Sequence, residues 1–376
     1  MADHGAVGAH VRGGAVSGGG EKLRVGFIGA GAITDLHYLG YQDYPKAEIH
    51  AICDVDETLL QRRASEWQIG KTYTDYRQLL ADPKVDAVEV ITPHHLHAEM
   101  GIAALEAGKH VSIQKPMAIT VAECDALIEA AGRAGKLMRV FENFRFYPPL
   151  VKAKRLLDDG AVGEPLSIRI KCVQGVSGED WEIPYRRWEW RFDPARGGGG
   201  RVILDYGYHL FSIAQWFMGA PEKVFAWITH RPIQHGWVLD SPAVVIWKYK
   251  EAEKYGSYEA VTSDDMLVPT KYGRPEDEWI ELTGSRGFIW VNRCTSMLLD
   301  RPAVEMYRDG ETTAFPEVDS DWGASFVAGV HDFVDAIAEG RQSELSGEEG
   351  KAVLRFCRAA QLSAKEGREV RPEETE

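Results

Sequence analysis

Asp205 and His209 are the two residues in this sequence best spaced for acid–base chemistry. They are four positions apart, so they share a face if the segment is helical. An aspartate that holds one imidazole nitrogen leaves the other nitrogen free as a base, and it stabilises the imidazolium that forms. Such a base could remove the proton of a hydroxyl group. The alternative is structural, with Asp205 capping a helix over 206–217 and His209 an ordinary, partly buried histidine.

A glycine turn near the start of the chain predicts a dinucleotide site. Residues 24–31 read Arg-Val-Gly-Phe-Ile-Gly-Ala-Gly, a buried strand that breaks into a turn and opens a helix. Backbone N–H groups at such a helix start bind pyrophosphate. Thr34 stands where the third glycine of the usual fingerprint would be. The residues we expect to contact the cofactor here are Gly29, Gly31, Ala32 and Ile33.

Asp54 indicates that the expected dinucleotide is NAD. It ends the second predicted strand, close to the spacing of about 20 residues at which a carboxylate binds the ribose hydroxyls. Its charge would repel a 2′-phosphate, which favours NAD over NADP. The alternative is that the glycines only make a tight turn and that Asp54 is a helix N-cap.

Aromatic and arginine side chains gather at residues 181–191, which contain three tryptophans and three arginines. Aromatic faces stack on the C–H surfaces of sugars, and guanidinium groups bind carboxylate, phosphate or sulfonate. An oligomer interface has a similar composition, and both interpretations stay open. The glycines 197–200 that follow are expected to form a substrate-facing loop or a plain connector. The candidate substrate residues of this segment are Tyr185, Arg187, Trp188, Trp190 and Arg191.

The histidines His94, His95 and His97 follow the predicted strand 87–91 and raise the question of a metal. His94 and His95 are adjacent and would point apart, and no acidic cluster accompanies them, so we expect no metal. The five cysteines are scattered without a CxxC pair, which favours neither a zinc site nor a disulfide framework. The expected compartment is therefore a reducing cytoplasm.

Two successive patterns of predicted strands and helices indicate an α/β fold with two domains. Strands over 23–28, 48–53, 87–91, 110–113 and 137–141 alternate with helices over 57–67, 95–107 and 121–134, which predicts a doubly wound parallel sheet. After a helix over 150–158, longer strands dominate, which predicts a mostly antiparallel sheet. Segments 230–237 and 255–275 are expected to be loops. Helices over 324–339 and 348–365 are expected to pack on the first domain or on the sheet edge.

The composition disfavours two kinds of binding partner, nucleic acid and membrane. The net charge of −14 disfavours nucleic acid, which needs a basic face. No stretch approaches the roughly 20 apolar residues that span a bilayer, so no membrane partner is expected. Residues 1–21 are expected to be a disordered leader.

Together these motifs resemble the glucose–fructose oxidoreductase / inositol dehydrogenase (Gfo/Idh/MocA) family. The resemblance rests on the glycine turn, Asp54, Thr92-Pro93 with His97, and Ala107–Val111 leading to Lys115-Pro116, and continues through Asn143, Arg145, 160–165 and 205–209. It implies an NAD-binding Rossmann domain over 22–147. A substrate-binding and oligomerisation domain with a large open sheet would follow over 148–376. It also implies a dimer or tetramer.

The resemblance implies roles for single residues. His209 would be the base, Asp205 its partner or a substrate ligand, and Lys115 the cation that positions the hydroxyl. Asn143 and Arg145 would face the substrate. The cofactor residues that it adds are Thr92, Pro93, His97, Gln114 and Lys115.

One departure concerns Gln114, which stands where the family usually has the glutamate of Glu-Lys-Pro. Losing that acid is expected to leave Lys115 less firmly charged and less tightly oriented. The predicted activity is NAD-dependent oxidation of a secondary hydroxyl, with C3 of a sugar, glycoside or cyclic polyol as the expected position. The alternative is a redox-neutral glycosidase with resident NAD that acts on an anionic glycoside such as a sulfoquinovoside or uronide.

Overall fold

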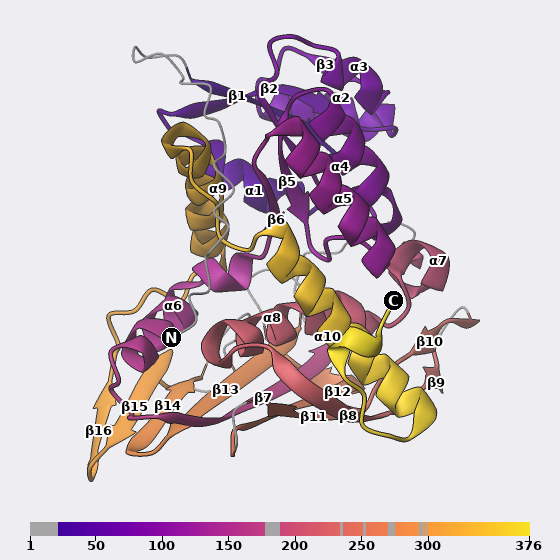
Figure 1. Ribbon diagram of the computed structural model, residues 1–376. Coiled ribbons are helices and arrows are strands. Elements are labelled where there is room, and N and C mark those ends of the chain that lie inside the picture. Colours follow the sequence, from indigo (N-terminus) through magenta and orange to yellow (C-terminus); the bar gives the residue numbers. More distant parts are fainter. Residues whose placement is uncertain are drawn as a thin grey trace, which may run out of the picture.

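The computed structural model contains two large sheets, one above the other in Figure 1. A parallel six-stranded sheet forms the N-terminal half, and a mixed eight-stranded sheet forms the C-terminal half, which confirms the predicted α/β class. The predicted leader lies outside the described residues. The structure describes residues 22–176, 189–233, 236–250, 253–269, 275–292, 296, 298 and 300–376.

The N-terminal sheet is the predicted doubly wound sheet, with strand order β3-β2-β1-β4-β5-β6 and parallel pairing. Val25 and Val88 on its central strands are completely buried, as expected of strands covered on both faces. The chain order reverses between β1 and β4, and ligands bind at this point of such sheets. The strands are β1 Leu23–Ile28, β2 Ala47–Cys53, β3 Thr72–Tyr73, β4 Ala87–Val90, β5 His110–Gln114 and β6 Met138–Phe141. The helices are α1 Thr34–Tyr41, α2 Glu57–Glu66, α3 Tyr76–Leu80, α4 His97–Glu106 and α5 Val121–Ala134.

Side-chain caps fix helix boundaries in this domain. The Asp56 carboxylate accepts the Leu59 N–H at the start of α2. Thr120 and Glu123 form a capping box at the start of α5, and Gly135 ends that helix in the left-handed conformation with φ 61°.

The C-terminal sheet has the order β16-β15-β14-β13-β7-β12-β11-β8. Only β7 and β12 pair in parallel among its described strands, so the sheet is mostly antiparallel, as predicted. Its strands are β7 Pro165–Val176, β8 Pro221–Ile228, β11 Ala243–Tyr249, β12 Tyr255–Leu267, β13 Glu276–Gly284, β14 Gly287–Val291, β15 Val304–Arg308 and β16 Glu311–Ala314.

The loop predicted over 255–275 is wrong, because most of that segment is the strand β12. Within 230–237, β9 (Arg231–Pro232) pairs with β10 (Val238–Leu239) in a separate two-stranded sheet, so this predicted loop contains one two-residue strand in its described part. In β12, Gly256, Tyr258 and Ala260 alternate with more exposed residues, which is the period of a half-buried strand. Two of these three buried positions hold glycine and alanine, so the sequence lacks the large apolar side chains that would reveal the period.

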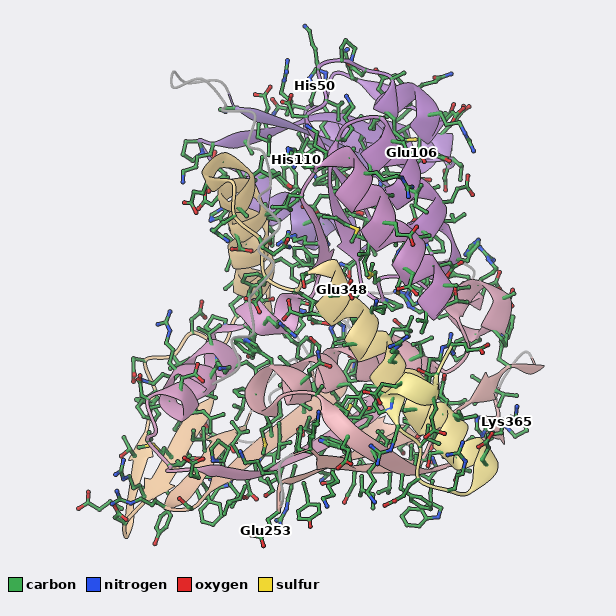
Figure 2. The ribbon with its side chains drawn as sticks, viewed as in Figure 1. His50, Glu106, His110, Glu253, Glu348 and Lys365 are labelled. Atoms are coloured by element: carbon green, nitrogen blue, oxygen red, sulfur yellow. The ribbon has the colours of Figure 1, made fainter. Side chains whose placement is uncertain are left out.

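Helices cover one face of the large sheet and leave the other face open (Figure 1). The covering helices include α6 (Pro148–Asp158), α8 (Gly207–Met218) and α10 (Gly347–Glu366). Side chains on the opposite face include Trp227 and Tyr255, which are 61% and 53% exposed. In Figure 2 the side chains around the labelled Glu253 extend below the sheet into open space. No described helix is long and apolar enough to cross a bilayer.

The two C-terminal helices join the domains in different ways. α9 (Trp322–Glu339) packs on α1, where a Cβ on Gly40 would lie 2.4 Å from Val330. α10 runs from the N-terminal domain, near the labelled Glu348, to the large sheet beyond Lys365 (Figure 2). Along it, Tyr208 Oη donates to the Gly350 carbonyl at 2.8 Å, and Ser363 Oγ accepts the Ala226 N–H at 3.0 Å. Both expected placements therefore occur, one for each helix.

Candidate active site

The glycine turn leaves room for a phosphate at the end of β1. Gly29 has φ +109°, and a Cβ there would lie 2.2 Å from the Ile91 carbonyl oxygen. A Cβ on Gly31 would meet no atom within 4 Å, so this side of the turn is open. Ala32 and Ile33 complete the turn, and no side chain caps α1. The helix start can therefore offer its N–H groups to a pyrophosphate.

Asp54 lies against the same turn. Its Oδ2 accepts the Ala30 N–H at 2.7 Å, and its Oδ1 accepts the Asp56 N–H at 2.9 Å. The N-cap of α2 is Asp56, so the structural alternative for Asp54 does not hold. Asp54 is placed where a ribose-binding carboxylate belongs in this fold.

The end of β4 supplies a second wall of the cofactor site. Thr92 lies beside Gly29, and its buried Oγ1 has no hydrogen-bond partner within the described chain. A buried hydroxyl without a partner is costly, and a bound dinucleotide would supply one. Pro93 follows, and the ring nitrogens of His97 lie 2.8 and 2.9 Å from the carbonyl oxygens of Pro116 and Thr92. Burial lowers the pKa of His97 to about 4, against the effect of the two carbonyls. A neutral ring carries one N–H, so it donates to only one of these carbonyls at a time.

Lys115 connects the two domains at the end of β5. Its Nζ donates to the Asp205 Oδ1 at 2.9 Å and to the Asp205 carbonyl at 2.6 Å. The ammonium thus has defined partners, and the looser orientation expected from the Gln114 substitution stays a prediction. The Gln114 side chain turns away from Nζ, since its Oε1 accepts the Lys115 N–H at 2.8 Å.

Asp205 is surrounded by cationic side chains and does not cap a helix. Arg191 Nε lies 3.1 Å and Arg201 Nη1 3.5 Å from its Oδ2, while His94 Nε2 lies 3.5 Å from Oδ1. Burial raises the pKa of Asp205, but Lys115, Arg191 and Arg201 outweigh it and hold the pKa well below the ordinary value. Burial lowers the pKa of His94 well below its ordinary value, so that ring is neutral. The described residues contain no group of three His, Cys, Asp or Glu side chains that could hold a metal.

His209 is held by Glu142, and not by Asp205 as predicted. Its Nδ1 lies 2.6 Å from Glu142 Oε1, and Glu142 is completely buried. The sequence interpretation missed Glu142, although an acid directly after a strand, at the ligand-binding edge of the sheet, is a usable signal. The predicted pairing fails because Lys115 and the arginines engage the Asp205 carboxylate.

The His209 ring is neutral and close to the other charged groups. Burial lowers its pKa, Glu142 opposes that effect, and the charges of Lys115 and Asp205 act on it as well. The ring stacks on Phe144 with centroids 4.4 Å apart. Because Nδ1 faces a carboxylate, Nε2 is the nitrogen able to accept a proton.

A π-helical turn, Arg201–Tyr206, carries Asp205 into the site. Asp240 accepts the N–H groups of Val202 and Ile203, each at 2.8 Å, which fixes the start of this turn. π-Helical turns are frequent at functional sites. The α8 helix that bears His209 follows without a break.

The glycine run before this turn is held by other elements. Gly198, Gly199 and Gly200 have φ values of +87°, +78° and +99°. From α10, Arg358 donates to the Gly198 carbonyl at 2.8 Å and Gln361 donates to the Gly199 carbonyl at 2.6 Å. His94 Nδ1 lies 3.1 Å from the Gly197 carbonyl. These contacts argue against a plain flexible connector. The run leads directly into Asp205, and its substrate-facing role stays a prediction.

The remaining candidate substrate residues differ in placement. Trp190 lies edge-on to His94 with centroids 4.7 Å apart, beside the Asp205 cluster. Asn143 donates to Ser325 Oγ at 3.0 Å, and Arg145 pairs with Glu344 and Glu349 at 2.8 and 2.9 Å. Both are 3% exposed, so these contacts anchor the segment after Glu142 rather than present it to a ligand. Tyr185, Arg187 and Trp188 lie outside the described residues.

A dinucleotide turn joined to a buried cluster of lysine, aspartate and histidine defines an NAD-dependent oxidoreductase. Residues 23–142 match the model of the oxidoreductase family with an NAD-binding Rossmann fold, and residues 150–290 match the GFO/IDH/MocA C-terminal domain. The chain belongs to the Gfo/Idh/MocA family.

Characterised relatives act on sugars and polyols. The chain is 30% identical to a myo-inositol 2-dehydrogenase of Thermotoga maritima, over 94% of this chain and 99% of that protein. It is 27% identical to a levoglucosan dehydrogenase of Pseudarthrobacter phenanthrenivorans, over 85% of this chain and 90% of that protein. A solved complex of levoglucosan dehydrogenase with NADH and levoglucosan is similar, with a TM-score of 0.79 and 27% identity over 93% of this chain and 99% of that chain.

Proposed function

We propose that this protein oxidises a secondary hydroxyl of a sugar, glycoside or cyclic polyol, with His209 as the base and Lys115 as the cation on the reacting oxygen. The observation that carries the proposal is the buried Glu142–His209 pair next to the Lys115–Asp205 pair. Bound NAD supplies the hydride acceptor in this chemistry.

Residues of this chain accept the proton of the substrate hydroxyl. His209 Nδ1–H donates to Glu142, so Nε2 accepts the hydroxyl proton while Glu142 stabilises the resulting imidazolium. The lowered pKa of His209 keeps the ring unprotonated and ready at neutral pH. The Lys115 ammonium stabilises the negative charge that develops on the oxygen, and Asp205 holds that ammonium in place.

For a pyranose we propose C3 as the reacting carbon. Arg191 and Asp205 flank Lys115 and can contact hydroxyls next to the reacting one. A carbon with hydroxyl-bearing neighbours on both sides uses all of these groups, and C3 is such a carbon.

A second candidate is an oxidoreductive glycosidase that acts on an anionic glycoside. Two guanidinium groups, from Arg191 and Arg201, converge on Asp205. Together with Lys115 they carry three positive charges against the two negative charges of Asp205 and Glu276. This excess favours an acidic sugar, because guanidinium groups bind carboxylate and sulfonate groups well.

One assay separates the candidates. NAD⁺ is incubated with myo-inositol, levoglucosan, D-apiose and a panel of neutral and anionic glycosides, and both NADH and released aglycone are followed. NADH that accumulates in step with consumed substrate supports the dehydrogenase, and loss of a C3 deuterium into NADH supports the position. Aglycone released without net NADH would overturn it in favour of the glycosidase.

We also propose that the open face of the large sheet is a homo-oligomer interface. Phe225, Trp227, Ile246 and Tyr255 point away from the helices on neighbouring strands, and an apolar face of this kind favours burial. Light scattering after size exclusion should show a dimer or tetramer for the native chain and a smaller species for W227K. A native monomer would overturn this proposal.

A further inference from the structure

Gln114 sits at the start of a buried hydrogen-bond chain behind Lys115. Its Oε1 accepts the Lys115 N–H at 2.8 Å, and its Nε2 lies 2.8 Å from His37 Nε2. The orientation of the amide is fixed, because the opposite orientation would turn an NH₂ group toward the Lys115 N–H. Gln114 therefore donates to His37 Nε2, which must be an unprotonated acceptor.

The second ring nitrogen of His37, Nδ1, faces the carboxylate of Glu89. His37 Nδ1 contacts Glu89 Oε2, and the other Glu89 oxygen accepts Tyr41 Oη at 2.7 Å. Because Nε2 accepts, the single ring proton is on Nδ1 and is donated to Glu89. His37 and Glu89 are both completely buried, so no water competes for these bonds.

The surroundings hold this arrangement in place. Phe141 and Phe326 pack on the His37 ring with centroids 4.2 and 5.4 Å away. The charged groups near the ring are Glu89 from β4 and Arg139 from β6, with Tyr41 from α1. Arg139 is completely buried and donates to the Gly329 carbonyl at 2.6 Å.

We propose that Gln114 is a positioning residue for Lys115, which locks His37 in its Nδ1–H tautomer and so ties the Lys115 peptide to the buried carboxylate of Glu89. The ammonium of Lys115 is fixed by Asp205 from the other domain, so the residue is held at both ends. A glutamate at position 114 still accepts the Lys115 N–H. It cannot donate to His37 Nε2, so the ring must take up a second proton or turn.

The role in turnover rests on the proposed function, whereas the tautomer does not. Histidine-selective ¹⁵N NMR of the native chain, with the His37 signals assigned by their loss in H37N, should show a protonated Nδ1 and an acceptor Nε2. A proton on Nε2 in the native chain would overturn the proposal. This spectrum decides the point even where a variant fails to fold or no sugar is oxidised.

Variants at position 114 test whether the hydrogen bonds of Gln114 to His37 and to the Lys115 N–H affect catalysis by Lys115. In Q114E the His37 signals should change to those of a ring protonated on Nε2. In Q114L, which removes both bonds of the amide, kcat should fall by about tenfold or more because the Lys115 peptide loses its support. The Kd of NAD⁺ should stay within about twofold, because the Gln114 amide bonds to the Lys115 N–H and to His37, and not to the cofactor as the resemblance implies. A larger change in Kd would show that Gln114 also contacts NAD⁺. The matched control is Q61E, an exposed residue of α2 that makes the same change of charge and should behave as the native chain. A native tautomer in Q114E, or a native kcat in Q114L, would contradict the proposal.

Discussion

The cofactor end and the catalytic end of this site are built in different ways. The cofactor end lies within one sheet: the Asp54 carboxylate after β2 accepts the Ala30 N–H of the turn after β1, and Thr92 after β4 lies beside the same turn. The catalytic end joins Lys115 to Asp205 and Glu142 to His209, across both domains and through buried side chains. Local backbone geometry thus specifies which cofactor binds, whereas packing between domains specifies the chemistry.

Replacing His209 should produce the largest effect at the catalytic end. H209A removes the general base, and we expect kcat to fall by about 10²–10⁴-fold. Isothermal titration should show unchanged NAD⁺ binding, because the ring contacts no part of the turn. The control H50A changes a histidine at the far side of the N-terminal domain (Figure 2) and should keep native activity. Near-native kcat in H209A would show that another group is the base.

Lys115 should give the next largest effect. K115M keeps the length of the side chain and removes the charge, so the developing alkoxide loses its cation and kcat should fall by about 10²–10³-fold. The loss also leaves the buried Asp205 without one partner, so the melting temperature is measured alongside kinetics. An exposed lysine provides the control in K84M. If K115M raises only KM, Lys115 binds substrate without aiding the transition state.

Replacing Asp54 tests the cofactor end of the site and should leave the catalytic step unchanged. In D54A the preference for NAD⁺ over NADP⁺, measured as a ratio of kcat/KM, should fall by roughly tenfold because a charge-assisted contact to ribose is lost. Saturating NAD⁺ should restore near-native kcat. D56A is the matched control from the same loop, because it removes the α2 cap and costs about 1 kcal/mol of stability without touching the ribose site. An unchanged preference in D54A would refute the ribose assignment.

The contrast between the two ends also explains what the sequence could predict. The glycine turn, the parallel sheet and the mostly antiparallel sheet follow from local patterns, such as the apolar run over β1 and the capping box of α5. The partner of His209 did not follow, because Glu142 is 67 positions away in the chain and only the packing of two domains brings it to the ring. Asn143 and Arg145 were expected to face the substrate, but their anchors on the C-terminal helices and on the segment between them are set by tertiary contacts. β12 was missed because two of its buried positions are Gly256 and Ala260, which give no strong apolar alternation.

The most direct test of the catalytic end is the pH dependence of kcat/KM in the native chain and in E142Q, with the exposed E129Q as control. Activity requires unprotonated His209, so it should fall only as the pH drops below the ordinary histidine pKa of 6.5, because burial lowers the pKa of this ring. Glu142 raises that pKa, so its removal should move the acidic limb to still lower pH and reduce the plateau by about tenfold. An acidic limb that stays in place in E142Q, or moves to higher pH, would contradict the assignment of the Glu142–His209 pair as the base.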